Sequence, residues 1–330
     1  MRPFEYAAAR TKAQAIGLLG SSFDQAEVLA GGSDLLALMK DDVVRPRRLV
    51  SIQEIPELRE IRAAEGGLSI GALRTLSELA DDREVRRRYP ALAQALEEAA
   101  SPQIRNVATL GGNLCQRPRC WYFRGGHGLL AKGPGGESLV VKGDNRYHAI
   151  LGNSGPAYFV SPSTIAPVLV AYGARLRIHG PKGDREVPVD KFFRVPQSEA
   201  EREHDLQPNE IVTEIVLPSA RGTQGANHEV RQKEAFDWPY ATASTVLRVA
   251  GGKVESARIV LGHVAPVPWV SEEAARAITG KPVNAETAAA AGRAAVESAK
   301  PLSRNKYKVQ LARVAVARAL LAAASATAAA

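Results

Sequence analysis

The sequence contains little cysteine, few aromatic residues and no long hydrophobic run. Two cysteines in 330 residues exclude a disulfide-stabilised scaffold. No apolar run reaches the roughly 18–20 residues of a membrane-spanning helix, and the charged N-terminus lacks the apolar segment of a signal peptide. We therefore expect a cytoplasmic protein without a membrane partner.

Aromatic residues make up 5% of the chain, so we expect a core built mainly from Leu, Val, Ile and Ala. Hydrophobic residues reach 45% and charged residues 24%, which excludes disordered and collagen-like chains. The chain has 43 Lys and Arg against 35 Asp and Glu, and this net charge of +8 favours anionic partners. The basic residues are dispersed, so a phosphorylated cofactor or an acidic protein surface fits better than nucleic acid.

The length predicts two or three domains, and the residue patterns divide the chain into three parts. Residues 1–55 are typical of a strand, a Gly-rich turn, a helix and a second strand. Residues 56–220 are mixed, and a linker is expected over 218–228. Residues 225–330 carry two strands followed by three helices. In the middle part we expect strands at 147–151, 158–160 and 211–217, a hairpin across 175–189, and little helix over 101–113.

Two stretches place paired glycines just after an apolar segment: residues 30–35 (AGGSDL) and residues 109–114 (TLGGNL). Glycine adopts backbone conformations closed to other residues, so successive N–H groups can point at one anion such as a pyrophosphate. The first stretch also precedes a predicted helix. Neither stretch has the G-x-G-x-x-G or G-x-x-x-x-G-K-S/T spacing, so a conventional Rossmann or P-loop site is excluded. A tight turn remains the alternative for each pair.

The sequence shows no set of side chains that could form a catalytic or metal site by itself. Cys115 and Cys120 are five residues apart, which fits neither a C-x-x-C redox pair nor a three- or four-ligand metal site. The histidines show no metal-binding spacing and no nucleophile–base pair is evident. We assign no catalytic residue and no metal ligand, so a bound cofactor would carry any reaction. The six histidines are His127, His148, His179, His204, His228 and His263.

Several motifs together resemble the FAD-binding subunit of molybdenum hydroxylases. They are residues 30–36 (AGGSDLL), 104–114 (IRNVATLGGNL), 116–124 (QRPRCWYFR), 145–152 (NRYHAILG), 161–167 (SPSTIAP) and 208–218 (PNEIVTEIVLP). This family includes the flavin subunits of xanthine dehydrogenases, CO dehydrogenases and aldehyde oxidoreductases. The 116–124 stretch points to the aldehyde oxidoreductase branch.

The resemblance implies an α+β fold: a two-part FAD-binding domain of the vanillyl-alcohol-oxidase (PCMH) type, then a C-terminal α+β domain like that of CO dehydrogenase flavoproteins. FAD subdomains would span residues 1–55 and 56–220, and the C-terminal domain 225–330. By resemblance, both glycine stretches would wrap the FAD diphosphate through backbone N–H groups. Other residues would contact or edge the cofactor, although Thr164 stands where relatives often have Asp. The implied cofactor-binding residues are Ala30, Gly31, Gly32, Ser33, Asp34, Leu35, Ile104, Arg105, Thr109, Leu110, Gly111, Gly112, Asn113, Ile150, Leu151, Ser163 and Thr164.

The chain departs from the family in its cysteines. Many relatives with the 116–124 motif hold a [4Fe-4S] cluster through four cysteines. Here Cys120 stands at the first of these positions, and an approximate alignment puts Leu129, Leu139 and Ala157 at the others. Such clusters usually need four thiolates. We therefore expect FAD and no [4Fe-4S] cluster in this chain.

The resemblance implies an electron-transfer subunit of a heterotrimer that oxidises an aldehyde, xanthine or another N-heterocycle. A large partner would carry the molybdopterin cofactor, and a small ferredoxin-like partner would pass electrons from [2Fe-2S] clusters to the FAD. Family members also reach the periplasm with a signal-bearing partner, which is the alternative location. Two further alternatives stay open: a stand-alone FAD-dependent oxidoreductase of the same fold, and a non-enzymatic nucleotide- or nucleic-acid-binding module. The substrate, the final electron acceptor and the stoichiometry do not follow from the sequence.

Overall fold

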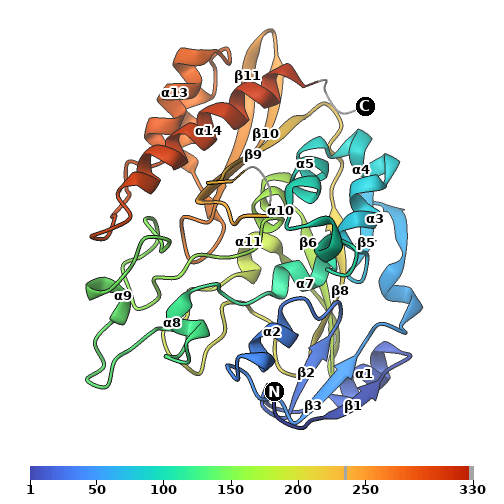
Figure 1. Cartoon of the computed structure of the whole chain (residues 1–330). Helices are drawn as coiled ribbons and strands as arrows, with labels where there is room; N and C mark the ends of the chain where they lie inside the picture. Colours follow the sequence, from blue (N-terminus) through green and yellow to red (C-terminus); the bar gives the residue numbers. More distant parts are fainter. Residues whose placement is uncertain (234–235, 327–330) are drawn as a thin grey trace.

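The computed structural model describes residues 1–233 and 236–326, which form three β-sheets with short helices around them (Figure 1). The N-terminus lies beside the first sheet, and the last described residues, which end at 326, lie beside the last sheet (Figure 1). Among the described residues, no helix combines the length and apolar character that crossing a membrane demands.

The first sheet is parallel, with the strand order β1-β3-β2. As the sequence predicts, strand β2 leads through the first glycine stretch into helix α2, and β3 then returns beside β2. Strand β1 is not predicted, because four residues (EYAA) are too few to show an alternating pattern. The elements are β1 (Glu5–Ala8), α1 (Lys12–Leu18), β2 (Ala26–Leu29), α2 (Leu35–Lys40) and β3 (Arg48–Ser51).

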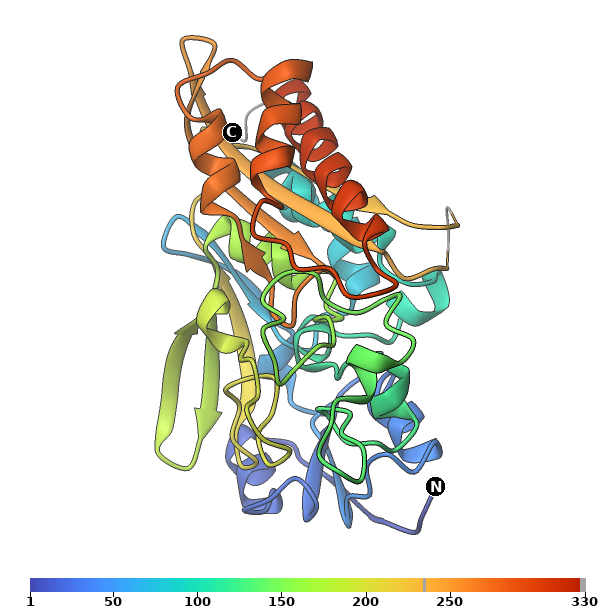
Figure 2. The ribbon, with the colours of Figure 1, turned by 90° about the vertical axis from the view of Figure 1, so that its left-hand side faces the viewer.

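The central sheet is antiparallel, with the order β4-β5-β8-β6-β7. Strand β6 alternates half-buried and buried residues, as expected of a strand with one face on a core. The β6–β7 hairpin runs along one side of the molecule (Figure 2). The strands are β4 (Ile61–Ala64), β5 (Gly67–Gly71), β6 (Arg175–Gly180), β7 (Gly183–Pro188) and β8 (Ile211–Leu217).

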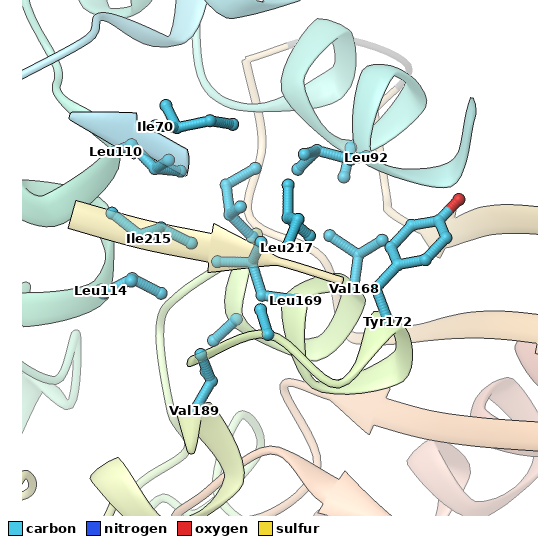
Figure 3. Close-up of a cluster of buried hydrophobic side chains, with 14 of the residues drawn as sticks. Ile70, Leu92, Leu110, Leu114, Val168, Leu169, Tyr172, Val189, Ile215 and Leu217 are labelled. Carbon is cyan, nitrogen blue, oxygen red and sulfur yellow. The ribbon is translucent and has the colours of Figure 1, made fainter. Parts of the chain in front are cut away.

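Helices α3, α5, α7 and α10 pack on this sheet and make the largest hydrophobic core. Figure 3 shows Ile215 and Leu217 of β8 facing side chains of α7 and α10. Tyr172 ends α10 and meets Tyr89 edge to face, with ring centroids 5.2 Å apart. The elements of this part are η1 (Pro56–Arg59), α3 (Leu76–Asp81), α4 (Arg83–Arg88), α5 (Pro90–Glu98), α6 (Pro102–Arg105), α7 (Leu110–Cys115), α8 (Trp121–Arg124), α9 (Leu139–Lys142), α10 (Ala166–Tyr172) and α11 (Val189–Phe192).

The C-terminal sheet, of order β12-β11-β10-β9, lies between two sets of helices. Helices α12, α13 and α14 cover one face, and α5 and α10 of the central part contact the other (Figures 1 and 2). The second large core lies under α12–α14 and is rich in alanine and valine, as the low aromatic content predicts. The elements are β9 (Gln224–Val230), β10 (Ala241–Ala250), β11 (Lys253–Gly262), β12 (Trp269–Val270), α12 (Glu272–Ile278), α13 (Ala285–Ala294) and α14 (Tyr307–Ser325).

Three local predictions are wrong. The linker expected over 218–228 ends in strand β9, whose polar sequence hides the signal, although it pairs with β10 over seven residues. Residues 101–113 contain α6 and the start of α7, which are capped by the Ser101 and Thr109 hydroxyls. Residues 147–151 and 158–160 form no strands. Positive φ angles at Gly152 and Gly155 turn the chain, so only Ala149 N–H pairs with the Tyr158 carbonyl across these segments, at 2.9 Å.

Candidate functional site

The first glycine loop connects β2 to α2 and carries a run of unpaired backbone N–H groups. No hydrogen bond to any described residue uses the amides of residues 31–35. Gly32 has φ +72°, in the left-handed region that favours glycine. Buried or half-buried amides normally find partners, so five consecutive unpaired donors in one loop indicate a place for an anion.

The second glycine loop begins helix α7, and its amides are already paired within the protein. The Leu110 and Gly111 N–H groups donate to the carbonyls of Arg74 and Ala72, both at 2.9 Å. The Gly112 and Asn113 N–H groups donate to the Thr109 hydroxyl and carbonyl, at 3.1 and 2.8 Å. The prediction that both loops offer unpaired amides is therefore wrong for the second loop, because its amides hold α7 in place.

Glycine at positions 31 and 111 allows close backbone approach. A Cβ on Gly31 would lie 1.9 Å from the Val107 carbonyl oxygen, so only glycine lets the first loop touch the segment before the second. A Cβ on Gly111 would lie 2.8 Å from the Ala72 Cβ, at the end of β5. Gly112 differs, since a Cβ there would meet only the Thr109 hydroxyl, at 2.8 Å. Gly31 and Gly111 thus bring the two loops side by side. Gly112 makes no such close approach to another part of the backbone.

Two cavities meet at these loops. The first cavity, of about 150 Å³, lies between the first sheet and α7, and the second, of about 350 Å³, lies between α7 and the C-terminal sheet. The residues common to both linings are Ser33, Asp34, Gly112 and Gln116. The first cavity is also lined by Ala30, Gly31, Gly32, Leu35, Thr109, Cys115, Arg202 and His204, among others. The second is also lined by Ile104, Asn113, Arg119, Thr164, Glu229 and Trp238, among others.

Asp34 anchors the junction of the two cavities through arginine-rich contacts. Its carboxylate accepts the Arg117 backbone N–H at 2.8 Å and the Arg124 guanidinium at 2.8 Å. Arg119 adds an ion pair at 3.1 Å. Two guanidinium groups around one mostly buried carboxylate leave an excess of positive charge. The junction therefore combines free N–H donors with a positive surround, which suits a diphosphate.

The floor of the first cavity is built on two buried ion pairs. Arg117 binds Glu203 with Nε–Oε1 2.8 Å, and Arg202 binds Glu27 at 2.6 Å. Burial raises the pKa of Glu27 despite Arg202. Burial would also raise the pKa of Glu203, but Arg117, His204 and Arg202 together lower it below its usual value. Burial also raises the pKa of the Cys115 thiol to about 12, so this cysteine is a neutral wall residue.

Asn113 joins the second glycine loop to the start of α10. Its Oδ1 accepts the Ser163 hydroxyl at 2.7 Å, and the same hydroxyl accepts the Ala166 N–H at 2.9 Å. Ser163 therefore stabilises the second glycine loop through Asn113, while its neighbour Thr164 lines the second cavity. Ile104, 41% exposed, lines the same cavity.

The structure does not bring every predicted residue to the cavities. Arg105 donates to the Ala99 and Ala100 carbonyls and lines none of the cavities found in the described chain. Ile150 and Leu151 are fully buried in the C-terminal core. Sequence reasoning missed several lining residues. They belong to no common motif and come together only in the folded chain: Phe23, Arg202, His204, Glu98, Glu229 and Trp238.

Cys120 packs against an apolar cluster. Leu129 and Ala157, at two of the expected cluster positions, are buried in a hydrophobic cluster against which Cys120 packs. Leu139, at the third, begins the short helix α9. Within residues 1–233 and 236–326 no group of three or more His, Cys, Asp or Glu could hold a metal ion. Aliphatic side chains cannot ligate iron, so these residues do not fit a four-cysteine cluster.

Comparison with known families covers almost the whole chain. Residues 2–220 match the FAD binding domain in molybdopterin dehydrogenase, and residues 227–323 match the CO dehydrogenase flavoprotein C-terminal domain. The first match therefore contains both glycine loops and all residues that line the first cavity.

Relatives of known identity align from end to end. The FAD-binding subunit of aldehyde oxidoreductase from Escherichia coli is 32% identical over 97% of this chain and 98% of the relative. The CO dehydrogenase medium chain from Hydrogenophaga pseudoflava is 32% identical over 97% and 96%. Its solved CO dehydrogenase structure superposes with a TM-score of 0.75 over 98% of both chains. Quinoline 2-oxidoreductase from Pseudomonas putida gives 0.77 at 25% identity, over 98% of this chain and 97% of the other.

Proposed function

This chain belongs to the family of FAD-binding subunits of molybdenum hydroxylases, and from that premise we propose that it holds FAD across the two cavities and relays electrons for a heterotrimer. In this proposal, a large molybdopterin-binding partner oxidises an aldehyde, xanthine or N-heterocycle. A small [2Fe-2S] partner delivers the electrons to this chain, which passes them to an external acceptor. FAD, when bound, supplies the redox chemistry, since it takes up and releases two electrons.

The observation that carries the FAD site is the run of unpaired amides in the first glycine loop. The N–H groups of residues 31–35 would donate to the FAD diphosphate at the junction where the two cavities meet. The two halves of the dinucleotide would then extend into the first and the second cavity. Gly32 and Gly112 leave room for the phosphates, and Asp34 keeps Arg119 and Arg124 beside them.

Three other groups of residues would orient the cofactor. The second loop, Thr109–Asn113, would act by shape, because its amides are already used within the protein. Ile104 and Thr164 would contact the half of FAD in the second cavity. Ser163 would act through Asn113 rather than by touching the cofactor. Arg105, Ile150 and Leu151 would act only indirectly, from their places outside the cavities.

We propose a three-part division of the chain at residues 1–55, 56–220 and 225–330. Each part has its own sheet, which supports this division. The diphosphate site would then lie between the first two parts, and the half of FAD in the second cavity would reach the third, where Glu229 and Trp238 line the wall.

Freshly purified full-length protein should be yellow and should release FAD, rather than FMN, on acid treatment. The expected stoichiometry is about one FAD per chain, measured by absorbance and chromatography of the released flavin, because only a dinucleotide fills both cavities. Copurification with two further chains would support the heterotrimer over a stand-alone oxidoreductase. A colourless protein that takes up no added FAD would contradict the proposal.

Iron analysis of the isolated chain should give close to zero iron per chain. The reason is that aliphatic residues, Leu129, Leu139 and Ala157, stand at three of the four predicted ligand positions, and Cys120 is the only thiol among the four. Inductively coupled plasma mass spectrometry on the chain separated from its partners would measure this. Four irons per chain would show that the cluster-loss argument is mistaken.

A further inference from the structure

A third cavity, of about 230 Å³, adjoins the second one. The two share Arg119, Asp237, Trp238 and Pro239, so this group forms the wall between them. The remaining lining is largely aromatic and comes from six separate stretches of the chain: Cys120, Trp121, Tyr147, His148, Phe159, Val160, Pro162, Gln232, Tyr240, His263 and Lys308. Nothing in the proposed FAD site uses this space.

His263 lines the third cavity as a buried histidine with no hydrogen-bond partner. It is 2% exposed, and neither ring nitrogen makes a hydrogen bond of normal geometry with a described residue, although the Pro162 carbonyl lies near the ring. Its φ of +61° is rare outside glycine and costs free energy. Burial, with a smaller effect of Lys308, lowers its pKa to about 3. The neutral ring therefore holds one N–H donor and one acceptor ready for a ligand.

Lys308 and His148 fix the inner end of the cavity. The buried Lys308 ammonium donates to the carbonyls of Tyr147, His148 and His263, at 3.1, 3.1 and 2.7 Å, so all three of its protons are used. The His148 Nε2 lies 3.2 Å from Cys120 Sγ, while its buried Nδ1 has no partner in the described chain. The backbone on both sides of the cavity is thus tied to one cation, which keeps His263 in place.

The side walls favour a flat ring. The Arg119 guanidinium stacks on Trp238, 4.8 Å from the ring centroid. The ring centroids of Trp238 and His263 are 6.3 Å apart. Tyr147 stacks on Tyr240 with centroids 5.5 Å apart. Aromatic walls of this kind bind planar rings by stacking and edge contacts.

The charges of the cavity disfavour a phosphorylated ligand. Lys308 has no proton left to donate to a phosphate. Asp237 adds a carboxylate to the wall. The free hydrogen-bonding groups are the imidazole of His263, Nδ1 of His148 and the Nε–H of Arg119. These suit an uncharged ring that carries carbonyl oxygens.

We propose that the third cavity binds a quinone, stacked between Trp238 and the tyrosines with a carbonyl oxygen hydrogen-bonded to His263. This inference rests on the proposed function, since the quinone would be the external acceptor. Each quinone would gain two electrons and two protons to become a quinol, and the reduced flavin would supply the electrons and lose two hydrogens in return. The wall shared by the second and third cavities would keep the flavin ring and the quinone ring close to each other, with Trp238 between them.

Isothermal titration of the FAD-loaded full chain with menadione, a naphthoquinone, tests the proposal. We expect saturable binding of one menadione per chain, and at least a tenfold higher Kd for His263→Asn, because asparagine tolerates the positive φ but does not place the imidazole N–H. His228→Asn is the matched control, since His228 also has an unpartnered ring nitrogen but lines no cavity described here. Its Kd should not change.

Tryptophan fluorescence then locates the ligand. Two of the three tryptophans, Trp121 and Trp238, line the third cavity, and Trp269 does not. Menadione should quench the fluorescence saturably in Trp269→Phe and much less in Trp238→Phe. FAD content is measured for each variant: an unmodified chain that takes up no FAD would contradict the proposed function, whereas an FAD-loaded chain that binds no menadione would contradict only the quinone site. Absence of 1:1 binding, an unchanged Kd in folded His263→Asn, or displacement of menadione by NAD⁺ would overturn the quinone site.

Discussion

Gly112→Leu should weaken FAD binding at least 100-fold, about 2.7 kcal/mol, while the fold stays intact. The new side chain would enter the space that the two cavities share, where the diphosphate is proposed to lie. Stability should change little, because two effects nearly cancel. Leucine gains about 1 kcal/mol over glycine in a helix, and disturbing the Thr109 cap costs about 1 kcal/mol. Flavin fluorescence titration of the FAD-free protein, with thermal unfolding alongside, measures both quantities.

Gly17→Leu provides the control for this experiment. Gly17 is an exposed glycine inside α1, with no atom within 4 Å of an added Cβ, so the same substitution there adds a side chain to solvent. Its FAD affinity should equal that of the unmodified chain. Retention of full FAD affinity in Gly112→Leu would mean that the phosphates lie elsewhere.

The elements that sequence patterns predict well are those with strong local signals. Strand β8 begins and ends at the predicted residues, and helix α2 follows the first glycine stretch as predicted, since each is an apolar segment next to turn residues. The family and its fold also follow from short motifs, because the glycines at 31 and 111 are forced by backbone contacts that no other residue allows. At these two positions the sequence motif and the packing have the same cause, which is the lack of room for a Cβ atom.

The features that sequence patterns miss are those that depend on contacts with residues far away in the sequence. Strand β9 (QGANHEV) has no strand-like alternation and exists because β10 pairs with it and α5 covers it. The pairing of the second loop's amides could not be foreseen either, since Leu110 and Gly111 donate to Arg74 and Ala72, more than thirty residues away in sequence. The third cavity draws on residues from 119 to 308, and no local motif connects them.

The second cavity contains a buried acid whose protonation links stability to pH. Glu229 on β9 has a side chain that is 2% exposed, and its Oε1 has no partner among the described residues. Burial, helped by the neighbouring Glu98, raises its pKa to about 8 although Arg231 lies 3.4 Å away. Glu98 lines the same cavity, and its pKa is also raised by burial. At neutral pH Glu229 is therefore largely protonated.

Glu229→Gln should make the protein less sensitive to alkaline pH. Between pH 4.5 and 8 the folded chain holds a proton on Glu229 that the unfolded chain has released, so the free energy of unfolding falls as pH rises. The gap between the two pKa values corresponds to about 5 kcal/mol at most. Glutamine matches the protonated acid in shape and stays neutral. The variant should gain about 2 kcal/mol or more at pH 8.5, less than the maximum because its amide also needs hydrogen bonds.

Urea unfolding of the FAD-free protein from pH 4 to pH 8.5 measures this effect, and the two curves should approach each other below pH 4.5, where Glu229 is protonated in both the folded and the unfolded chain. Glu255→Gln is the matched control, because Glu255 is exposed on β11 and lines none of the described cavities. Its curve should follow that of the unmodified chain. A constant offset between the Glu229→Gln and unmodified curves at every pH would show that the side chain acts through packing, whereas a gap that widens from about pH 4.5 to pH 8 and then levels off assigns the loss of stability to this one proton.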